Sequence, residues 1–268
     1  MPKLDRRSVL VGSLAGVTVG GGIGFFSGTL AERGAVSRTV APFEADGSKP
    51  SFAQQGEDRV VKNMLDFLGI ERPSYLDIGA HHPSINSNTY LFYGAGGRGV
   101  LVEPNPAYAQ LLRERRPGDI VLEVGIGVSA QTEADYYVTG GDGQRNTFSK
   151  EQMDELVARN PNTKVRVIKR PLVPINDVLA KHFPSGGPDF VSIDVEGLDH
   201  DILKTLDFSR FRPKVFCVET SLFDGTVHPG ILELMASKEY ALRGGSLVNS
   251  VFIDQRALSA TVEADRKD

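Results

Sequence analysis

From Ser51 onward, segments with apolar residues at helical spacing alternate with short continuous apolar runs. The recurrence of Val61, Leu65 and their neighbours predicts an amphipathic helix over 54–68. Short apolar runs predict strands, and longer periodic segments predict further helices. The expected strands are 75–78, 99–102, 120–124, 133–138, 189–193, 214–218, 240–243 and 251–253, and the expected helices are 106–115, 199–206 and 231–237. This alternation indicates an α/β fold with a mostly parallel sheet covered by helices on both faces, hence three layers.

One stretch interrupts this rhythm. Gly140–Gly143 is rich in glycine, and the Ser149 to Gln152 segment fits a capping box that opens a helix. An insertion of this kind in an α/β domain is either a lid or acceptor-binding element or a plain surface excursion.

The N-terminal segment has a different pattern. Lys3, Arg6 and Arg7 precede an uncharged stretch from Ser8 to Ala31, which is about as long as a membrane-spanning helix. The Arg6-Arg7 pair resembles a twin-arginine export signal, whereas glycines at every fourth position would suit a helix packed in lipid. We therefore expect an N-terminal hydrophobic helix, either a cleaved signal or a membrane anchor. The positive-inside rule would then place the following domain on the far side of the membrane, although a cytoplasmic location stays open.

These patterns divide the chain into four parts. We expect a signal or anchor at 1–31, a linker at 32–50, one α/β domain at 51–255 and a tail at 256–268. The net charge of −4 provides no basic surface, so nucleic acid is not expected as a partner. The single cysteine, Cys217, excludes an intramolecular disulfide and a thiolate metal cluster.

Polar residues follow several of the predicted strands. Ligands of open parallel sheets bind beyond the carboxyl ends of the strands, so these positions are the candidate site. The first strand ends in Asp77-Ile78-Gly79-Ala80, and His81, His82 and a proline follow. No Gly-x-Gly-x-x-Gly occurs there, which disfavours the pyrophosphate of NAD or FAD and makes a dehydrogenase the weakest alternative. A nucleoside ligand without phosphates remains possible.

Carboxylates end two further strands. Glu103, with Asn105 close behind, ends the second strand, where an acid can accept hydrogen bonds from both ribose hydroxyls. Asp194 and Glu196 follow a buried strand and would point the same way if the backbone is extended. Paired carboxylates suit a general base, recognition of a sulfonium, or a divalent cation such as Mg²⁺. A helix N-cap is the structural alternative.

Several of these segments together resemble the FkbM-type methyltransferases. The resemblance extends from about Ser51 to Ile253 and rests on several segments in order. These are Ser51–Asp58, Tyr75–Pro83, Ser87–Tyr90, Gly99–Pro106 and Ser192–Gly197. It implies a class I methyltransferase fold with a seven-stranded sheet whose last strand is antiparallel. It also implies S-adenosylmethionine as cofactor and O-methylation of a sugar, a polyketide or a related small-molecule hydroxyl.

The resemblance also implies roles for individual residues. Asp77, Gly79 and Ala80 would line the methionine side of the cofactor, Glu103 would hold the ribose, and Asp194 would lie near the transferred methyl group. His81 stands where many such folds have asparagine. The candidate cofactor-binding residues are therefore Asp77, Gly79, Ala80, His81, Glu103, Asn105 and Asp194.

Methyl transfer to a hydroxyl requires a base. Asp194 is the first candidate and His82 the second. Two alternatives stay open: Mg²⁺ held by Asp194, Glu196 and Glu219 could activate the hydroxyl, or the chain could be a membrane-tethered module that keeps the fold without catalysis. The export-like N-terminus supports the second alternative, because S-adenosylmethionine is made in the cytoplasm.

Overall fold

The computed structural model describes residues 50–140, 145–222 and 225–266. The chain divides into the units Met1–Ser48 and Lys49–Asp268, and all described residues belong to the second. The predicted N-terminal helix, and all of the predicted linker except Pro50, lie outside the described residues. Among the described helices, none combines the length and the apolar character needed to cross a lipid bilayer.

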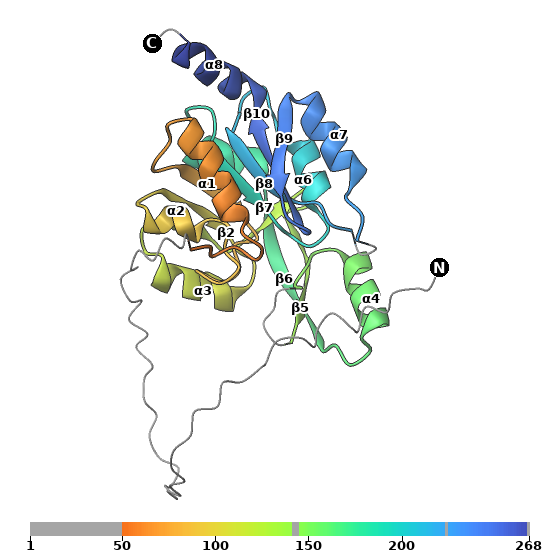
Figure 1. Ribbon diagram of the computed structural model, residues 1–268. Helices are drawn as coiled ribbons and strands as arrows, with labels where there is room; N and C mark the ends of the chain where they lie inside the picture. The colour runs from red at the N-terminus through yellow and green to blue at the C-terminus, as the bar shows by residue number, and fades with distance from the viewer. Residues whose placement is uncertain (1–49, 141–144, 223–224, 267–268) are drawn as a thin grey trace, which may run out of the picture. The chain divides into compact units, whose positions relative to one another are not determined.

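A seven-stranded sheet forms the centre of the domain (Figure 1). Its strand order is β3-β2-β1-β7-β8-β10-β9. Only β10 runs against its neighbours β8 and β9, which confirms the predicted mostly parallel sheet with an antiparallel last strand. The bounds are β1 Ser74–Ile78, β2 Arg98–Val102, β3 Ile120–Leu122, β7 Phe190–Ile193, β8 Val215–Glu219, β9 Tyr240–Gly245 and β10 Asn249–Asp254.

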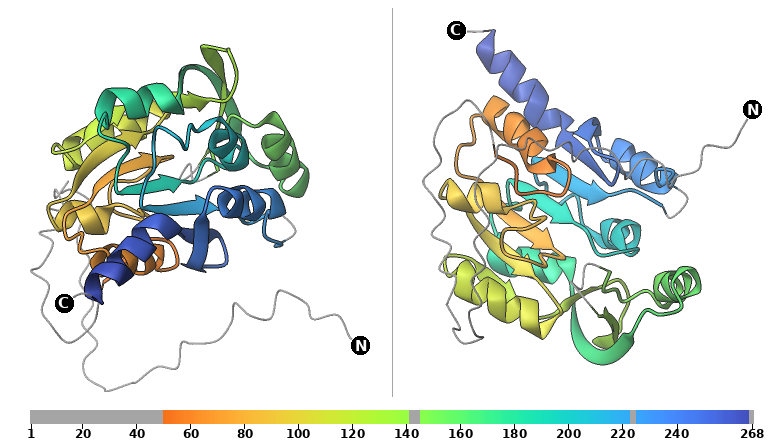
Figure 2. Two further views of the ribbon diagram at one scale, coloured as in Figure 1. Left: turned by 90° about the horizontal axis from the view of Figure 1, so that it is seen from above. Right: turned by 60° about the horizontal axis from the view of Figure 1, so that its bottom comes forward.

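Helices cover both faces of this sheet (Figure 2). One face packs against α1 (Glu57–Phe67), α2 (Tyr90–Gly94) and α3 (Pro106–Arg115). The other packs against α5 (Ile175–His182), α6 (Asp199–Thr205) and α7 (Pro229–Ser237). Successive strand residues alternate between the two apolar cores, as the period of two requires. Tyr75 and Leu101 join the first core, whereas Leu76 and Val100 join the second.

The predicted insertion forms a small separate layer. Strand β6 (Val165–Pro174) pairs with β5 (Glu133–Thr139) on one side and β4 (Gly125–Gly127) on the other. Between β5 and β6 the chain forms α4 (Lys150–Arg159), which is capped by Ser149. The Ser149 hydroxyl accepts from the Gln152 amide at 3.2 Å. The amide of Ser149, however, donates to Thr147 Oγ1, so only one half of the predicted capping box is seen.

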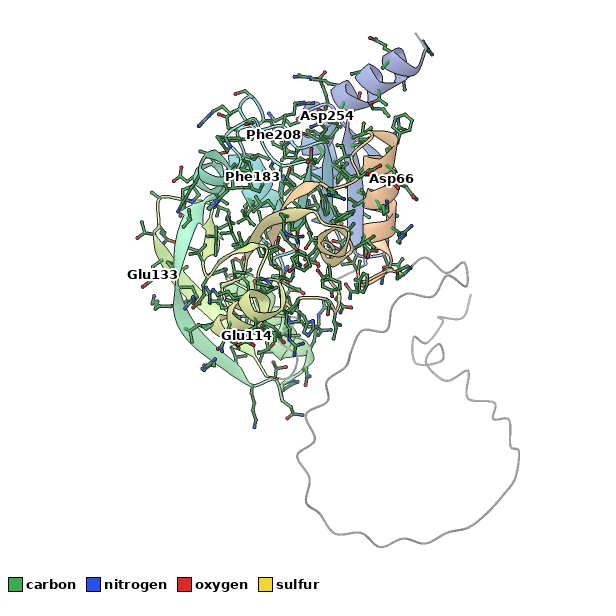
Figure 3. The ribbon with its side chains drawn as sticks, turned by 90° about the vertical axis from the view of Figure 1, so that its left-hand side faces the viewer. Asp66, Glu114, Glu133, Phe183, Phe208 and Asp254 are labelled. Atoms are coloured by element: carbon green, nitrogen blue, oxygen red, sulfur yellow. The ribbon has the colours of Figure 1, made fainter. Side chains whose placement is uncertain are left out.

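Several segments differ from the sequence prediction, among them α2, β4 and two longer ones. The segment 165–182 contains β6 and α5, neither of which was expected. The predicted tail at 256–268 instead contains most of α8 (Gln255–Asp265). Asp254, labelled in Figure 3 at the foot of α8, caps this helix through the Arg256 amide and pairs with Arg212. A capped N-terminus therefore starts a helix that the apolar pattern alone did not reveal.

The order of the strands reverses between β1 and β7. These two strands are adjacent, yet the helices that follow them lie on opposite faces of the sheet. Such a reversal opens a crevice at the carboxyl ends of the strands. The candidate active site lies in this crevice.

Candidate active site

A cavity, called the first cavity here, opens at the carboxyl ends of β1, β2 and β7. Four of the predicted residues line it: Gly79, His81, Glu103 and Asp194. Residues from β4, β5 and the start of the insertion form another wall, with Ile126, Tyr136 and Phe148. The sequence-based convergence of strand ends is therefore seen for Gly79, Glu103 and Asp194.

Gly79 has a structural reason for being glycine. Its φ of 87° lies in the left-handed region, and a Cβ there would lie 1.9 Å from the carbonyl oxygen of Asp194. The Asp194 amide donates to Ile78 at 3.0 Å, so the ends of β1 and β7 are held in direct contact. The close approach of the neighbouring strand end therefore requires glycine here, in addition to the approach of a ligand that the sequence predicts.

Glu103 is a buried carboxylate fixed by two backbone amides. Its Oε2 accepts from the His81 amide at 2.8 Å and its Oε1 from the Asn105 amide at 2.7 Å. Burial raises the pKa of Glu103 to about 7, and these two hydrogen bonds partly oppose that rise. Each oxygen keeps a second lone pair, so the carboxylate can still accept from hydroxyl groups in the cavity.

Three carboxylates gather beside the end of β7. Ligand atoms of Asp194, Glu196 and Glu219 all lie within 4.8 Å of one another. Glu196 has a φ of 56°, so the segment is turned rather than extended, and convergence arises through this turn. Neither Asp194 nor Glu196 is a helix N-cap. Asp199 closes the turn instead, accepting from the amides of Val195 and Gly197.

The pKa values of this cluster are raised. Burial, followed by repulsion from Glu196, raises the pKa of Asp194 well above its usual range. Burial and repulsion from Asp194 do the same for Glu219, and a hydrogen bond between Asp194 and Glu219 partly opposes the effect at Asp194. The pKa of Glu196 rises to about 7 through burial, although Arg145 lowers it somewhat. A carboxylate with a raised pKa is suited to accept a proton near neutral pH.

A second cavity is also lined by these carboxylates. Asp194, Glu196 and Gln54 line both cavities. The far wall of the second cavity is one face of α4 and its C-terminal end, and the near wall comes from the segment after β8. Its remaining lining residues are Arg145, Thr147, Gln152, Leu156, Arg159, Asn160, Glu219, Ser221, Leu222 and Val248.

The inserted segment is held against the carboxylate cluster. Thr147 Oγ1 donates to the carbonyl of Glu196 at 2.8 Å. Gln152 packs so closely on Gly197 that a Cβ at the glycine would lie 2.4 Å from Nε2. These contacts explain why the insertion forms a wall of the site and is not a plain surface excursion.

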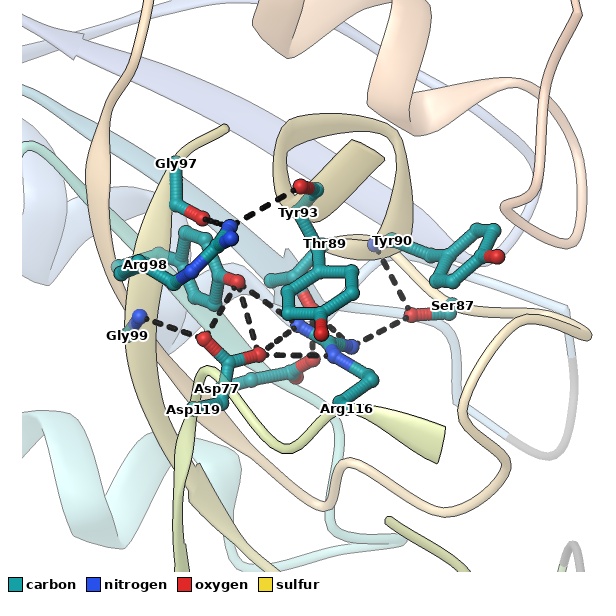
Figure 4. Close-up of polar contacts among 11 residues, drawn as sticks. Asp77, Ser87, Thr89, Tyr90, Tyr93, Gly97, Arg98, Gly99, Arg116 and Asp119 are labelled. Atoms are coloured by element: carbon teal, nitrogen blue, oxygen red, sulfur yellow. Dashed lines mark hydrogen bonds and ion pairs between the residues drawn. The ribbon is translucent and has the colours of Figure 1, made fainter. Parts of the chain in front are cut away.

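Asp77 lies outside the first cavity. It is 4% exposed and accepts a 2.5 Å hydrogen bond from Thr89. Thr89 also receives a hydrogen bond from Arg116, which is fully buried and pairs with Asp119 (Figure 4). Asp77 is thus part of an internal polar network beneath the glycine turn, and its predicted contact with the cofactor stays a prediction.

Three other predicted residues do not line the first cavity. His82 Nδ1 accepts from the amides of Ser84 and Ile85, so the histidine stabilises a turn, and its role as a base stays a prediction. Asn105 caps α3, accepting from the Ala107 amide at 3.0 Å. Ala80 is buried in the core beside α1, and its amide bonds the Val102 carbonyl.

Sequence reasoning missed other residues of the first cavity. Asn88, within a segment of the family resemblance, lines the cavity and donates to Ser192 at 3.0 Å. Phe148 and Tyr136 pack together with ring centroids 4.6 Å apart. Asn249 begins β10, far along the chain. Asn88 could have been found through the family resemblance. The other residues do not lie just after the carboxyl end of a predicted strand, so no local pattern identified them.

Comparisons with solved structures give methyltransferases of low sequence identity. A TehB-like S-adenosylmethionine-dependent methyltransferase from Corynebacterium glutamicum is 10% identical, with 75% of this chain and 88% of that chain covered and a TM-score of 0.41. An O-methyltransferase from Bacillus cereus in complex with S-adenosylhomocysteine is 14% identical, with 81% and 94% covered and a TM-score of 0.39. The 1,6-didemethyltoxoflavin-N1-methyltransferase of Burkholderia thailandensis is 13% identical, with 75% and 79% covered and a TM-score of 0.39.

No curated protein matches the sequence. A family model does match: that of the methyltransferase FkbM domain, over residues 77–242. This match spans more than half of the chain, including the glycine turn, Glu103 and the carboxylate cluster. The protein belongs to the FkbM methyltransferase family.

Proposed function

We propose that this protein transfers the methyl group of S-adenosylmethionine to a hydroxyl of a polar small molecule, such as a sugar or a polyketide. The observation that carries the proposal is that Asp194 lines both cavities. One cavity has the residues expected for a nucleoside, and the other has a mostly polar lining suited to a hydroxylated acceptor.

The first cavity fits the cofactor chemically. Glu103 offers carboxylate oxygens to the ribose hydroxyls, and Phe148 with Tyr136 offers an aromatic surface to the adenine ring. The turn after β1 contains His81 and no phosphate-binding glycine loop, which suits a ligand without pyrophosphate. These residues would hold the nucleoside, and the methionine part would extend past Gly79 toward Asp194.

The chemistry needs orientation and one proton acceptor. When bound, S-adenosylmethionine supplies a methyl group on a sulfonium, which an oxygen nucleophile attacks in line. Asp194, in its ionised form, accepts the proton of the acceptor hydroxyl. Glu103 on one side and α4 on the other fix the two reactants, and such positioning contributes most of the acceleration in a displacement of this kind.

Calorimetry with S-adenosylhomocysteine tests the cofactor assignment. The full chain should bind this product and should not bind NAD. Glu103→Ala should weaken binding roughly tenfold or more, because hydrogen bonds to a charged acceptor contribute about 1.5–3 kcal/mol. Glu114→Ala, on the exposed side of α3, is the control and should leave affinity unchanged. Equal affinity of the Glu103→Ala and unmodified proteins would refute the ribose role.

The carboxylate cluster supports one alternative mechanism, in which a metal ion activates the acceptor hydroxyl. Asp194, Glu196 and Glu219 offer oxygen ligands close enough together for one Mg²⁺ ion, which would activate the hydroxyl in place of a free base. Methyl transfer should then stop in excess chelator and return with magnesium. Activity that persists after exhaustive chelation would exclude this variation and favour the metal-free base.

The non-catalytic alternative makes a different prediction. A module that only retains the fold would bind S-adenosylhomocysteine and produce none of it from S-adenosylmethionine with any hydroxylated acceptor. The convergence of a raised-pKa carboxylate on two cavities favours catalysis. Release of S-adenosylhomocysteine that depends on a hydroxylated acceptor is the deciding measurement.

A further inference from the structure

Asn249 carries an unusual polar atom in the first cavity. The residue is 1% exposed and starts β10, where it pairs with Glu219 at the end of β8. Its side-chain oxygen, Oδ1, is buried and has no hydrogen-bond partner among the described residues. Leaving a buried acceptor unsatisfied costs about 1–3 kcal/mol, so a ligand donor is the natural partner for it.

The orientation of this amide is set by Glu57. Asn249 Nδ2 donates to Glu57 Oε1 at 3.2 Å. A flipped amide would place its oxygen against the Glu57 carboxylate, where two acceptors would meet. The nitrogen therefore faces Glu57, and the oxygen is the atom that has no partner among the described residues.

Glu57 itself is held firmly. It is 1% exposed, and it accepts from the Ser246 hydroxyl at 2.6 Å and from the Gln55 amide at 2.8 Å. Gln55 in turn accepts from the Leu247 amide at 2.9 Å. The start of α1 and the turn before β10 thus form one preorganised support for Asn249.

The location of Asn249 identifies the ligand group. Strand β10 lies four positions from β2 in the sheet, so Asn249 and the ribose-binding candidate Glu103 lie at opposite ends of the first cavity. A cofactor held by its ribose at Glu103 would present its amino-acid end toward Asp194 and Asn249. The hydrogen-bond donor at that end is the α-ammonium group.

The charge of this end also favours a cation. Asp194, Glu196 and Glu219 lie there with carboxylate oxygens within 4.8 Å of one another. A positive ligand group would therefore be attracted to this end of the cavity.

We infer that Asn249 Oδ1 accepts a hydrogen bond from the α-ammonium of the cofactor's methionine part, with Asp194 supplying the opposing charge. This inference rests on the proposed cofactor. It assigns the recognition of the amino group to Asn249 at the start of β10, which lies beyond the matched family region that ends at residue 242.

Calorimetry of the full chain with two ligands tests the inference. One is S-adenosylhomocysteine, and the other is its deaminated analogue, which keeps the carboxylate and has hydrogen in place of the amino group. Asn249→Ala should lower affinity for S-adenosylhomocysteine about tenfold or more and leave affinity for the analogue unchanged. Equal losses for both ligands, or no loss for S-adenosylhomocysteine, would overturn the assignment.

Two further variants separate binding from folding. Asn249→Ser keeps a hydroxyl for Glu57 but lacks the carbonyl oxygen, so it should show the same ligand selectivity if the alanine variant is unstable. Ser250→Ala removes a hydrogen bond to Thr220 on the next residue of the strand and should leave both affinities unchanged. If the unmodified chain fails to bind S-adenosylhomocysteine, the cofactor proposal itself fails. If it binds and both Asn249 variants bind equally well, only the role of Asn249 is refuted.

Discussion

At the scale of single residues, the protonation state of Asp194 controls the proposed chemistry. The carboxylate must be ionised to accept a proton, and burial with repulsion from Glu196 raises its pKa well above the usual range. The rate of methyl transfer should therefore rise with pH and level off once Asp194 is ionised. Asp194→Asn should lower kcat about a hundredfold or more and abolish this acid limb. It should also weaken binding of S-adenosylhomocysteine, because it removes the charge that faces the α-ammonium, but by a smaller factor than it lowers kcat.

Glu196 provides the matched variant for this profile. Glu196→Gln removes the largest electrostatic contribution to the raised pKa of Asp194. The acid limb of the kcat profile should then move to lower pH while the plateau is preserved. A limb that stays in place in Glu196→Gln would contradict the assignment of that limb to Asp194.

Arg116 illustrates a residue whose importance is structural. Its side chain is fully buried, pairs with Asp119 at 2.8 Å and donates to Thr89 and Tyr75 at 3.0 Å each. Figure 4 shows these contacts meeting between β1, β2 and the segment before α2. Removing one partner of a buried pair costs about 3–5 kcal/mol, so Arg116→Met should lower the free energy of unfolding by that amount.

A nearby arginine is the control for this measurement. Arg113 pairs with Glu123 at an exposed position, where ion pairs contribute about 0–1 kcal/mol. Urea unfolding of Arg113→Met should therefore resemble that of the unmodified protein. Similar losses in the two variants would show that the buried network contributes no more than a surface pair.

At the scale of elements, the strands of the main sheet were the most predictable part. Runs such as 99–102 are apolar on both sides because helices cover both faces, and such runs are visible without knowledge of their partners. Strand β6 was not visible, because its Val165–Arg170 stretch alternates with charged residues and is mostly exposed. Pairing with β5 and β4 defines that strand, and a local pattern cannot report such pairing.

The candidate site likewise contains residues that the local sequence identifies and residues that only tertiary contacts place there. Gly79, Glu103 and Asp194 end regular strands, so the rule for parallel sheets located them. Asp77 also lies near the end of a strand, but its carboxylate accepts a hydrogen bond from Thr89, which in turn accepts one from Arg116. These contacts hold Asp77 in the interior of the protein. Phe148 and Asn249 enter the first cavity from the insertion and the last hairpin, whose placement depends on tertiary contacts.

The insertion separates the two cavities in a testable way. Phe148 lines the first cavity, whereas Leu156 of α4 lines the second. Phe148→Ala should reduce affinity for S-adenosylhomocysteine roughly tenfold, since it removes the aromatic surface proposed for adenine. Leu156→Ala should leave this affinity unchanged in the same calorimetric titration. A comparable loss in both variants would argue against separate sites for cofactor and acceptor.

At the scale of the whole molecule, the N-terminal segment raises the question of location. We propose that residues 1–31 direct the chain to the membrane or across it, on the basis of the Arg6-Arg7 pair and the uncharged stretch that follows. Replacing both arginines with lysine should reduce export, measured by fractionation with protease protection. An unchanged distribution would contradict a twin-arginine route.

The clustering of buried acids should also make the stability of the ligand-free protein depend on pH. The pKa values of Glu103 and Glu196 rise from 4.5 to about 7, and that of Asp199 rises from 3.8 to about 6. The folded state therefore holds protons that the unfolded state has released. Stability from these groups is fully present below about pH 4 and is lost as pH rises to about 7, by up to roughly 1.4 kcal/mol per pH unit per group.

Glu103→Gln isolates one such contribution, because glutamine is neutral throughout. The difference in melting temperature between Glu103→Gln and the unmodified protein should change in favour of the variant between about pH 5 and pH 7 and should level off above that range. A shift of 1 kcal/mol corresponds to about 2–4 °C for a domain of this size, so the trend is measurable. A cofactor that donates hydrogen bonds to Glu103 would stabilise its ionised form, so saturating S-adenosylhomocysteine should flatten the dependence of the unmodified protein. A constant difference between the two proteins across this range would mean that Glu103 is ionised with an ordinary pKa.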